Sequence, residues 1–452
     1  MSKIQRISGL QHEFSFFSPS DNFNSYYSRF LESNLGKIYI AIPWQELTKS
    51  FQLKDSIKGP TSTFSPQGKL GLMFLKHYAQ VSDKRLLEQL NSNIDYQFFC
   101  DINLGSERLK NHKMISQIRC ELADNLKISE QELVLSKHWN PYIENKGNIF
   151  TDATCYESEV RYPTDQKLLW ESVEWSNKQM KKICTTLGLK LPRTKYTKWK
   201  KRYLGYSKMR RKTKSKRKSL TRSLLHLLNK INKELDNLEL SHSFEMPNLY
   251  SKRRNTIRII YQQQHLLFTT GEYPKNRIVS ISKDYLRPII RGKEIKRVEF
   301  GAKVNKLQID GINFIQHISF NAFNEGTQLE NTVNKSQQLT RIRVKKLGAD
   351  AIYATNANRK YVTKNDIKTD FRPKGKKSKY YKEQQASRQI ISKERATRLE
   401  GSFGKEKEHY HLKKIKAKTE KTEILWIFFG IHTANALEIG RRITKLKLEK
   451  AA

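Results

Sequence analysis

One carboxylate in the sequence occupies a position where its charge needs a nearby cation. Asp152 lies in the middle of residues 147–155, a short apolar segment of β-forming residues that predicts a buried strand. Burying a carboxylate costs free energy unless a positive charge compensates for it, and a metal ion is a common compensating charge. The alternative is that Asp152 caps the strand or pairs with a Lys or Arg residue. Taken alone, that alternative is the simpler one.

A second lone aspartate occurs in a similar context far downstream. Residues 347–353 are another short apolar segment, which predicts a strand carrying Asp350. A helical pattern over residues 331–346 precedes this segment, and Thr355 can cap a helix behind it. A second carboxylate in a matching context favours one shared site over two unrelated strand caps.

The third carboxylate belongs to a helical pattern. Residues 395–407 predict a helix in which Leu399 and Phe403, four residues apart, share the buried side. Glu400 and Lys407 are two turns apart and therefore share a face. By itself, Glu400 is more simply interpreted as an exposed residue of an amphipathic helix. The position gains significance only from the two aspartates that precede it.

The charge balance of the whole chain indicates a polyanionic partner. The 452 residues include 86 Lys and Arg but only 44 Asp and Glu, which leaves a formal net charge of +42. Nucleic acid is the usual partner of such a surface, although a ribosomal-type or merely solubilising surface has a similar balance. Hydrophobic residues at 37% and aromatic residues at 10% argue against a disordered basic tail and predict folded cores.

Other features of the sequence exclude several protein classes. The cysteines show no CxxC spacing, so they predict neither a zinc site nor a disulfide framework; they are Cys100, Cys120, Cys155 and Cys184. The start of the chain lacks an apolar signal-peptide core, and the longest apolar run, residues 424–429, is too short to cross a bilayer. We therefore expect a soluble, cytoplasmic protein with no membrane partner.

Residues 1–145 predict a compact helical domain. Ser65 with Pro66 opens one helix, and Ser82 with Asp83 opens the next. Helical pairs joined by short turns can read DNA, yet most of them are only packing units. We expect this domain to serve DNA binding or assembly.

A strongly basic helical segment occupies residues 165–275. Its densest part contains Lys200, Lys201, Arg210, Arg211, Lys216 and Arg217. Basic side chains neutralise phosphates, whereas the interleaved aromatic residues either stack on bases or anchor helices to a core; these are Tyr196, Trp199, Tyr203 and Tyr206. Apolar residues at spacings of three and four over residues 224–238 predict a long helix. We expect a helical hairpin whose basic outer surface lies across DNA.

The second half of the chain predicts most of a β-sheet. Strand patterns occur at residues 277–282, 298–304 and 312–320. Asp310 and Gly311 predict a tight turn before the last of these strands. Together with the strand that carries Asp152, these segments predict one sheet.

These features in combination resemble the DDE triad of ribonuclease-H-like transposases, and specifically the bacterial insertion-sequence transposases of the insertion sequence five superfamily. The resembling stretches are residues 70–104, 151–154, 162–165, 287–293, 298–304, 349–355 with Asn358 and Arg359, and 398–404 with Lys407. Each motif alone is weak, but together they cover most of the chain and are specific. One departure is that many relatives place an Arg four residues before the Glu, whereas this sequence has Ala396, flanked by Arg395 and Arg398.

The resemblance implies a fold of class α/β (α+β). A helical N-terminal domain, residues 1–145, would be followed by a ribonuclease-H-like mixed-sheet catalytic domain, residues 146–452. The basic helical insert at residues 165–275 would interrupt the catalytic domain.

The resemblance also implies a two-metal site. Asp152, Asp350 and Glu400 would be the catalytic residues and would hold two Mg²⁺ ions, which Mn²⁺ can replace. Such ions activate an attacking oxygen and stabilise a leaving one. The DNA contacts implied for the site are Lys407, Arg398, Arg291 and Lys293, and those expected of the insert are Lys200, Lys201, Arg210 and Arg211.

The function implied by the resemblance is that of a DNA transposase. It would cut at the ends of an insertion sequence and join the freed 3′-hydroxyl ends to target DNA. Its partners would be the terminal inverted repeats, the target DNA and a second copy of the chain, without a small-molecule substrate, at the bacterial nucleoid. Two alternatives stay open: a DNA-binding transposase derivative without catalysis, and a ribonuclease-H-like nuclease that cuts without strand transfer. The presence of all three carboxylates disfavours the first alternative.

Overall fold

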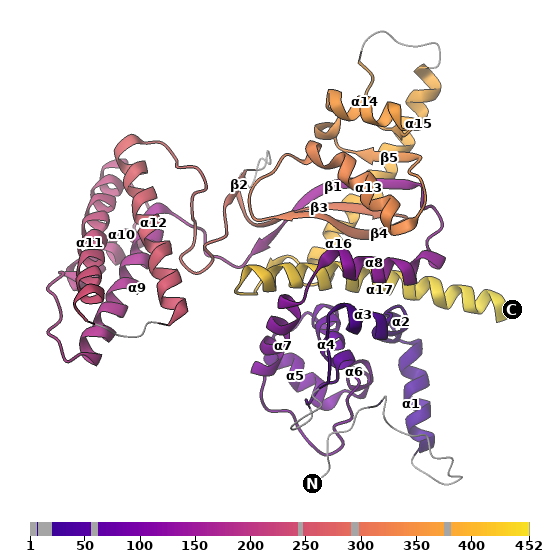
Figure 1. Cartoon of the computed structure of the whole chain (residues 1–452), viewed down its shortest axis with the longest axis horizontal. Helices are drawn as coiled ribbons and strands as arrows, with labels where there is room; N and C mark the ends of the chain where they lie inside the picture. The colour runs from indigo at the N-terminus through magenta and orange to yellow at the C-terminus, as the bar shows by residue number, and fades with distance from the viewer. Residues whose placement is uncertain are drawn as a thin grey trace. The chain divides into compact units, whose positions relative to one another are not determined.

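The computed structural model describes residue 7 and residues 20–55, 62–242, 247–290, 298–374 and 381–451. The chain divides into two compact units. The larger unit comprises Met1–Ser158, Ala302–Ser319 and Phe323–Ala452, and the smaller one comprises Glu159–Gly301 with Phe320–Ala322. The fold is a mixed α/β fold, mostly helical, with a mixed sheet (Figure 1).

The N-terminal third of the described chain is helical, as predicted. Its helices are α1 (Ser20–Glu32), α2 (Asn34–Ile40), α3 (Trp44–Ser50), α4 (Pro66–Ala79), α5 (Asp83–Ser92), α6 (Ile94–Phe99), α7 (Lys113–Asp124) and α8 (Ile128–Trp139), the last followed by the 3₁₀ turn η2 (Asn140–Tyr142). The predicted starts of α4 and α5 are confirmed. Ser65 Oγ accepts a hydrogen bond from the Gly68 N–H at 2.9 Å, and Ser82 Oγ accepts one from the Arg85 N–H at 3.2 Å.

The sheet of the larger unit is built around the strand that carries Asp152. Its strands are β1 (Asn148–Ser158), β3 (Val298–Ile309, in this unit from Ala302), β4 (Ile312–Ser319), β5 (Lys346–Ala349), β6 (Lys368–Thr369) and β7 (Lys414–Ile415). The order is β3-β1-β5-β6, in which β1, β5 and β6 are parallel. β4 pairs antiparallel with β3 through a turn at Asp310 and Gly311, whose φ angles are 48° and 84°. The predicted strand around Asp152 and the predicted hairpin are both confirmed.

One long helix joins the N-terminal helices to the sheet. α17 (Glu420–Ala451) packs against β4 and also against α2, α4 and α7. Its Phe429 ring meets Phe74 edge-on with centroids 4.8 Å apart and stacks on Phe51. Gly440 lets the helix approach α2 closely, since a Cβ there would collide with the Lys37 carbonyl. The expected boundary between residues 145 and 146 therefore falls inside one compact unit, and the division into two domains stays a prediction.

The smaller unit contains the basic segment. Its elements are α9 (Asp165–Thr186), α10 (Tyr196–Lys208), α11 (Lys214–Ser241), α12 (Asn248–Thr270) and β2 (Pro288–Ile290), which pairs with the first residues of β3. The predicted apolar seam is confirmed, because Leu224, Leu228, Ile231 and Leu235 of α11 are buried in its core. The segment is thus a packed group of helices rather than a single hairpin.

One predicted strand is wrong. Residues 277–282 form a loop in which side chains satisfy the backbone. The N–H of Ile278 donates to Gln263 Oε1 at 3.0 Å, and Ser280 Oγ accepts from two backbone N–H groups that follow it. Because local side chains supply these partners, the segment does not pair with the sheet.

The remaining helices of the larger unit follow the sheet. They are η3 (Glu325–Gln328), α13 (Leu329–Thr340), η4 (Ala351–Tyr353), α14 (Asn356–Lys364), α15 (Tyr381–Glu394), the π-helix η5 (Arg395–Glu400) and α16 (Gly401–His409). The helix predicted over residues 331–346 ends earlier, at Thr340, because Arg341 adopts a left-handed φ of 60°. No helix of the described residues is long and apolar enough to span a membrane.

Candidate active site

One face of β1 carries polar side chains toward the η5–α16 helix. Side chains alternate along a strand, so Asp152, Thr154 and Tyr156 point to the same side. Lys407 Nζ donates to Thr154 Oγ1 at 3.0 Å, and the Tyr156 hydroxyl donates to Glu406. α16 is therefore fixed along the face of β1 that presents Asp152.

Parallel pairing brings the second aspartate beside the first. Thr151 of β1 lies opposite Ala349 of β5. Asp152 and Asp350 are the residues that come directly after this pair in the sequence, so they occupy neighbouring positions. Asp350 lies just after β5 rather than within a strand as predicted, and its Oδ1 accepts the Ala351 N–H at 2.7 Å. The predicted cap at Thr355 is confirmed.

A further aspartate, which the sequence reasoning missed, lies at the end of the next strand. Asp370 follows β6, and its Oδ1 accepts the Ala349 N–H at 3.1 Å. The only sequence signal was the short segment of residues 367–369, which is too brief to predict a strand. Three neighbouring parallel strands thus carry aspartates at one level of the sheet: Asp152 midway along β1, and Asp350 and Asp370 just after β5 and β6.

Arg395 connects these carboxylates with Glu400. Its guanidinium Nη1 lies 3.0 Å from Glu400 Oε1 and 3.6 Å from Asp152 Oδ2, and its Nε lies 3.8 Å from Asp370 Oδ2. The Arg395 side chain is only 14% exposed, so solvent screens these ion pairs less than it screens surface pairs. Arg395 is the cation that compensates the charge of the half-buried Asp152.

The π-helix places Arg395, rather than Arg398, beside the carboxylates. In a π-helix, residues five apart are neighbours, as Arg395 and Glu400 are here. Many transposases that the sequence resembles have an arginine four residues before the Glu, where this chain has Ala396. The π-helical turn brings Arg395, five residues before Glu400, into contact with Glu400 instead. Arg398 instead lies 3.4 Å from Asp310 and is 48% exposed. π-bulges are often found at functional sites, which agrees with this placement.

Burial and neighbouring charges perturb Asp152. Burial raises its pKa to about 6; the charges of Glu325 and Asp350 also raise it, whereas the Ala153 N–H and Arg395 lower it. Burial raises the pKa of Asp370 as well, again opposed by Arg395. Asp152, Asp370 and Glu400 share the single guanidinium of Arg395, and this excess of carboxylate is the electrostatic condition for binding a metal ion or a phosphate-bound cation.

The residues present fit a hard divalent cation by their chemistry. Asp152, Asp350 and Glu400 supply carboxylate oxygens, which Mg²⁺ and Mn²⁺ prefer. In the geometry seen here, no group of three or more His, Cys, Asp and Glu side chains among the described residues is arranged to hold a metal ion. The guanidinium of Arg395 lies between Asp152 and Glu400 instead, so a metal would have to replace it.

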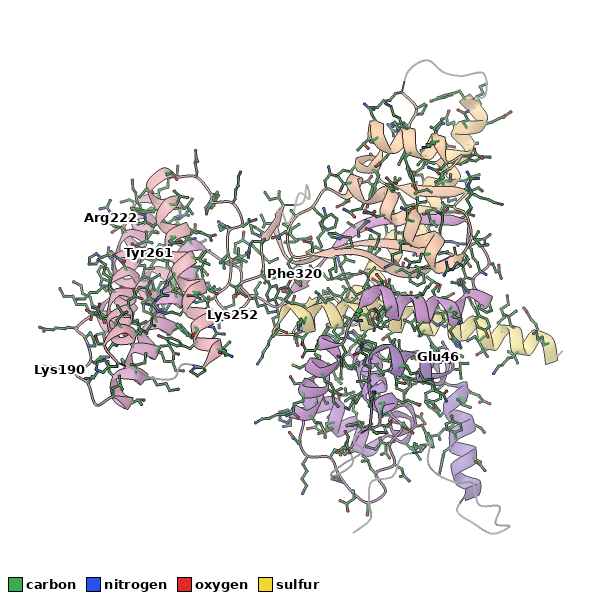
Figure 2. All side chains as sticks on the ribbon, viewed as in Figure 1. Glu46, Lys190, Arg222, Lys252, Tyr261 and Phe320 are labelled. Carbon is green, nitrogen blue, oxygen red and sulfur yellow. The ribbon has the colours of Figure 1, made fainter. Side chains whose placement is uncertain are left out.

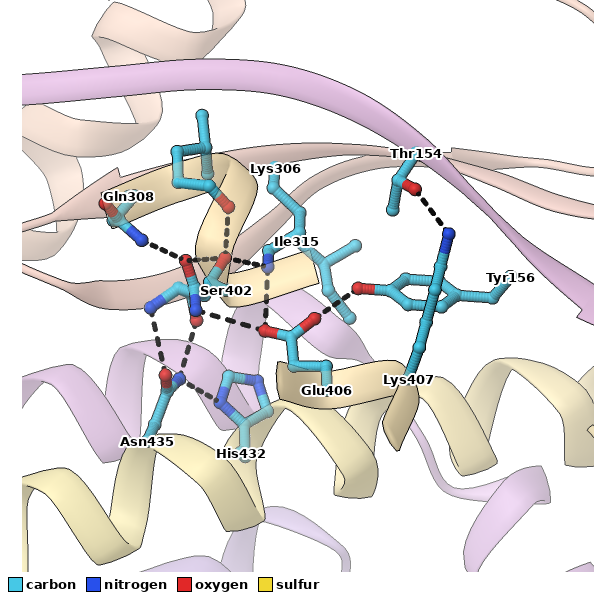
Figure 3. Close-up of polar contacts among 12 residues, drawn as sticks. Thr154, Tyr156, Lys306, Gln308, Ile315, Ser402, Glu406, Lys407, His432 and Asn435 are labelled. Atoms are coloured by element: carbon cyan, nitrogen blue, oxygen red, sulfur yellow. Dashed lines mark hydrogen bonds and ion pairs between the residues drawn. The ribbon is translucent and has the colours of Figure 1, made fainter. Parts of the chain in front are cut away.

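A buried ion pair supports the helix that carries these residues. Lys306 of β3 and Glu406 of α16 are 2.7 Å apart, and their side chains are 0% and 1% exposed (Figure 3). Burial lowers the pKa of Lys306, and the carboxylate of Glu406 opposes that effect. Lys306 Nζ also donates to Ser402 Oγ at 3.0 Å. The pair joins α16 to the strand next to β1.

The same network extends to the C-terminal helix. Asn313 Nδ2 donates to Glu406 Oε1 at 3.1 Å, and Asn435 Nδ2 donates to the Asn313 carbonyl at 2.6 Å (Figure 3). His432, beside Asn435, lies 3.2 Å from Glu132 of α8. Hydrogen bonds and ion pairs that are buried in this way restrict how their elements can be arranged, so the position of α16 is tied to α8 and α17.

The DNA contacts predicted for the basic insert lie in the smaller unit. The basic side chains of the insert are exposed: Lys200, Lys201, Arg210, Arg211, Lys216 and Arg217. Lys190, Arg222 and Lys252, labelled in Figure 2, are exposed as well. Arg291 and Lys293 fall outside the described residues.

The aromatic residues of the insert anchor its helices. Tyr203 stacks on Trp170 with centroids 4.8 Å apart, and Tyr196 stacks on the same ring at 5.5 Å. Trp199 packs against the same core and Tyr206 is buried in it. Of the two interpretations left open by the sequence, packing therefore accounts for these four rings.

Two parts of the chain match known protein families. Residues 347–431 match the transposase DDE domain, and residues 24–121 match a transposase domain designated DUF772. No curated protein and no solved structure matches the chain. The first match includes Asp350, Asp370, Arg395 and Glu400, and begins after Asp152.

These matches define the class of protein. The DDE domain is that of a polynucleotidyl transferase, and such enzymes generally use divalent metal ions. The chain is a transposase with an N-terminal transposase domain and a DDE domain. The predicted enzyme class is confirmed, whereas neither match names the insertion sequence five superfamily.

Replacing Asp152 should stabilise the metal-free protein at neutral pH. The folded-state pKa of about 6 is above the ordinary value of 3.8, so the stability that protonated Asp152 gives is present at low pH and is lost as the pH rises through about 6. Asp152→Asn should raise the free energy of unfolding by on the order of 2–3 kcal/mol at pH ~7.5 and by little at pH ~4. Urea denaturation at both pH values measures this difference. A variant less stable than the wild type at the higher pH would contradict the assignment.

Breaking the buried pair should destabilise the larger unit. Lys306→Met and Glu406→Gln each leave one buried charge unpaired, so each should cost about 3–5 kcal/mol in the free energy of unfolding. The double variant should cost less than the sum of the two. Lys413→Met is the matched control, because Lys413 and Glu408 form an exposed pair 2.9 Å apart whose loss should leave the free energy of unfolding nearly unchanged. Equal losses for the buried and exposed pairs would refute this role.

Proposed function

We propose that this transposase cuts DNA at the ends of an insertion sequence and joins the freed 3′-hydroxyl ends to target DNA, as a member of the insertion sequence five superfamily with a ribonuclease-H-like catalytic domain. The observation that carries the proposal is the convergence of Asp152, Glu400 and Asp370 on Arg395, with Asp350 beside Asp152. All of these except Asp152 lie in the segment that matches the DDE domain.

In this proposal, Asp152, Asp350 and Glu400 hold two Mg²⁺ ions, which Mn²⁺ can replace. The ions supply the charge neutralisation that phosphodiester hydrolysis and transesterification require. Asp152 would be the central ligand of the site, because it is half-buried whereas Asp350 and Glu400 are exposed, and because Asp350 and Glu325 lie near it. Burial is the main cause of the raised pKa of its carboxyl, and the charges of Glu325 and Asp350 add to it.

Two basic residues of the η5–α16 helix position the DNA strand. Lys407 lies 3.0 Å from Thr154, two residues from Asp152 along β1, where it can hold the scissile or flanking phosphate. Arg395 can keep its 3.8 Å ion pair with Asp370 when its contacts with Asp152 and Glu400 are lost, and its guanidinium can then bind a phosphate bidentately. Arg398, which is half exposed on the same helix, is a further candidate for a phosphate contact.

The smaller unit supplies a sequence-independent DNA surface. Lys200, Lys201, Arg210 and Arg211 are exposed on α10 and in the residues that follow it, and the rings between them are committed to packing. Such side chains neutralise phosphates without reading bases. We propose that the insert lies across DNA while two copies of the chain act on the two ends of the element.

Cleavage of DNA that carries the gene with its flanking sequence tests the proposal. The purified protein with Mg²⁺ or Mn²⁺ should release ends bearing 3′-hydroxyls at inverted repeats and should join them to a second DNA. Asp152→Asn, Asp350→Asn and Glu400→Gln should each lose cleavage by at least about 100-fold and keep DNA binding, because each removes a metal ligand but no phosphate contact.

Two outcomes would contradict the proposal. Cleavage without joining would identify a nuclease, and binding without cleavage would identify a DNA-binding derivative. Glu408→Gln is the matched control, since Glu408 is an exposed carboxylate of the same helix that pairs with Lys413; this variant should cleave at the rate of the wild type.

A further inference from the structure

Two motifs that have no role in the site above meet in the smaller unit. Residues 162–165 and 287–293 are separated by the whole helical insert, yet Tyr162 and Pro163 of the first motif and Arg287, Pro288 and Ile290 of the second line one cavity of about 520 Å³. Tyr273 and Arg277 complete its wall. A cavity of this size is in the range that small organic ligands occupy.

The cavity presents aromatic surface to solvent. Tyr162 is 64% exposed and Tyr273 is 67% exposed, which is unusual for rings that line a cavity. Tyr162 meets the buried ring of Phe300 edge-on with centroids 5.8 Å apart, and this contact favours one orientation of the Tyr162 ring. These rings contrast with those of α10, which are committed to the core of the same unit.

Two arginines give the cavity positive charge. The guanidinium of Arg277 lies 4.6 Å from the centre of the Tyr273 ring and 3.6 Å from Asp165, the acidic residue of the first motif. Arg287 is held by the loop, because its Nη1 donates to the carbonyls of Asp284 and Leu286. The described residues that line the cavity include both arginines but no Asp or Glu.

This combination fits one class of ligand within DNA. In a paired duplex the faces of the bases are covered by their neighbours, so an exposed ring can stack only on a base that is unpaired or turned out of the helix. The arginines match the phosphates on either side of such a base. A lining that has two arginines and no acidic residue favours an anionic ligand such as DNA over a segment of protein.

We propose that this cavity binds an unpaired nucleotide of the DNA substrate, with the base against Tyr162 and Tyr273 and the adjoining phosphates near Arg277 and Arg287. The proposal rests on the proposed function in that the ligand is DNA. It assigns to the insert the recognition of distorted DNA, in addition to the neutralisation of phosphates by its helices.

The test compares the binding of the full-length protein to two duplexes of the same sequence. One duplex is fully paired, and the other has a single thymine opposite an abasic position, so that turning the thymine out costs no base pair. Fluorescence anisotropy should show that the second duplex binds at least about five-fold more tightly, the effect expected of one base stacked on an aromatic ring. Tyr162→Ala and Tyr273→Ala should each reduce this preference several-fold and leave binding of the paired duplex unchanged.

Matched variants separate this role from folding and from charge. Tyr162→Phe and Tyr273→Phe keep the ring and should keep the preference, and melting curves of the alanine variants should match the wild type because both rings are largely exposed. Lys200→Gln with Lys201→Gln should weaken binding of both duplexes equally and flatten its dependence on salt.

The remaining outcomes are distinct. If the wild type binds paired DNA but shows no preference, or if the alanine variants weaken both duplexes equally, the cavity does not bind an unpaired nucleotide. If the wild type binds neither duplex, the proposed function itself fails.

Discussion

The ion pairs of Arg395 are the interaction on which the geometry of the site depends. Parallel pairing of β1, β5 and β6 brings Asp152, Asp350 and Asp370 together, where burial, assisted by the charge of Asp350, raises the pKa of Asp152 and of Asp370. A π-helical turn then places one guanidinium within 4 Å of Asp152, Asp370 and Glu400. This cation offsets the repulsion between the carboxylates. Under the proposed function the same carboxylates would bind divalent metal ions, and Arg395 would take the place of these ions in the free protein.

The second constraint is the buried pair that holds the helix against the strand. Lys306 and Glu406 lie almost entirely out of water, and Glu406 also accepts from Tyr156 and Asn313. Charges buried in this way are stable only when each has its partner in place, so the pair admits few positions of α16. Because α16 follows η5 directly, fixing the helix also fixes Arg395 and Glu400. The polar network around Asn435 extends this constraint to the long C-terminal helix, which packs on the N-terminal helices.

The sequence predicted the elements whose signals are local. The strand around Asp152, the turn at Asp310 and Gly311, and the caps at Ser65 and Thr355 follow from neighbouring residues and were confirmed. It could not reveal Asp370, because β6 is two residues long and is recognisable only by its pairing with β5. The choice of Arg395 over Arg398 depends on a π-helical turn that leaves no pattern in hydrophobic spacing. The loop at residues 277–282 has strand-like composition, but Gln263 and Ser280 satisfy its backbone.

The most direct test of this account is a titration of the protein with Mn²⁺, monitored by electron paramagnetic resonance. If Asp152, Asp350 and Glu400 bind metal and Arg395 occupies the place of the cation, Arg395→Gln should bind Mn²⁺ more tightly than the wild type. Asp350→Asn should bind it more weakly, and Arg398→Gln, whose arginine pairs with Asp310 instead, should bind it as the wild type does. Mn²⁺ affinities that are the same in all four proteins would contradict the account.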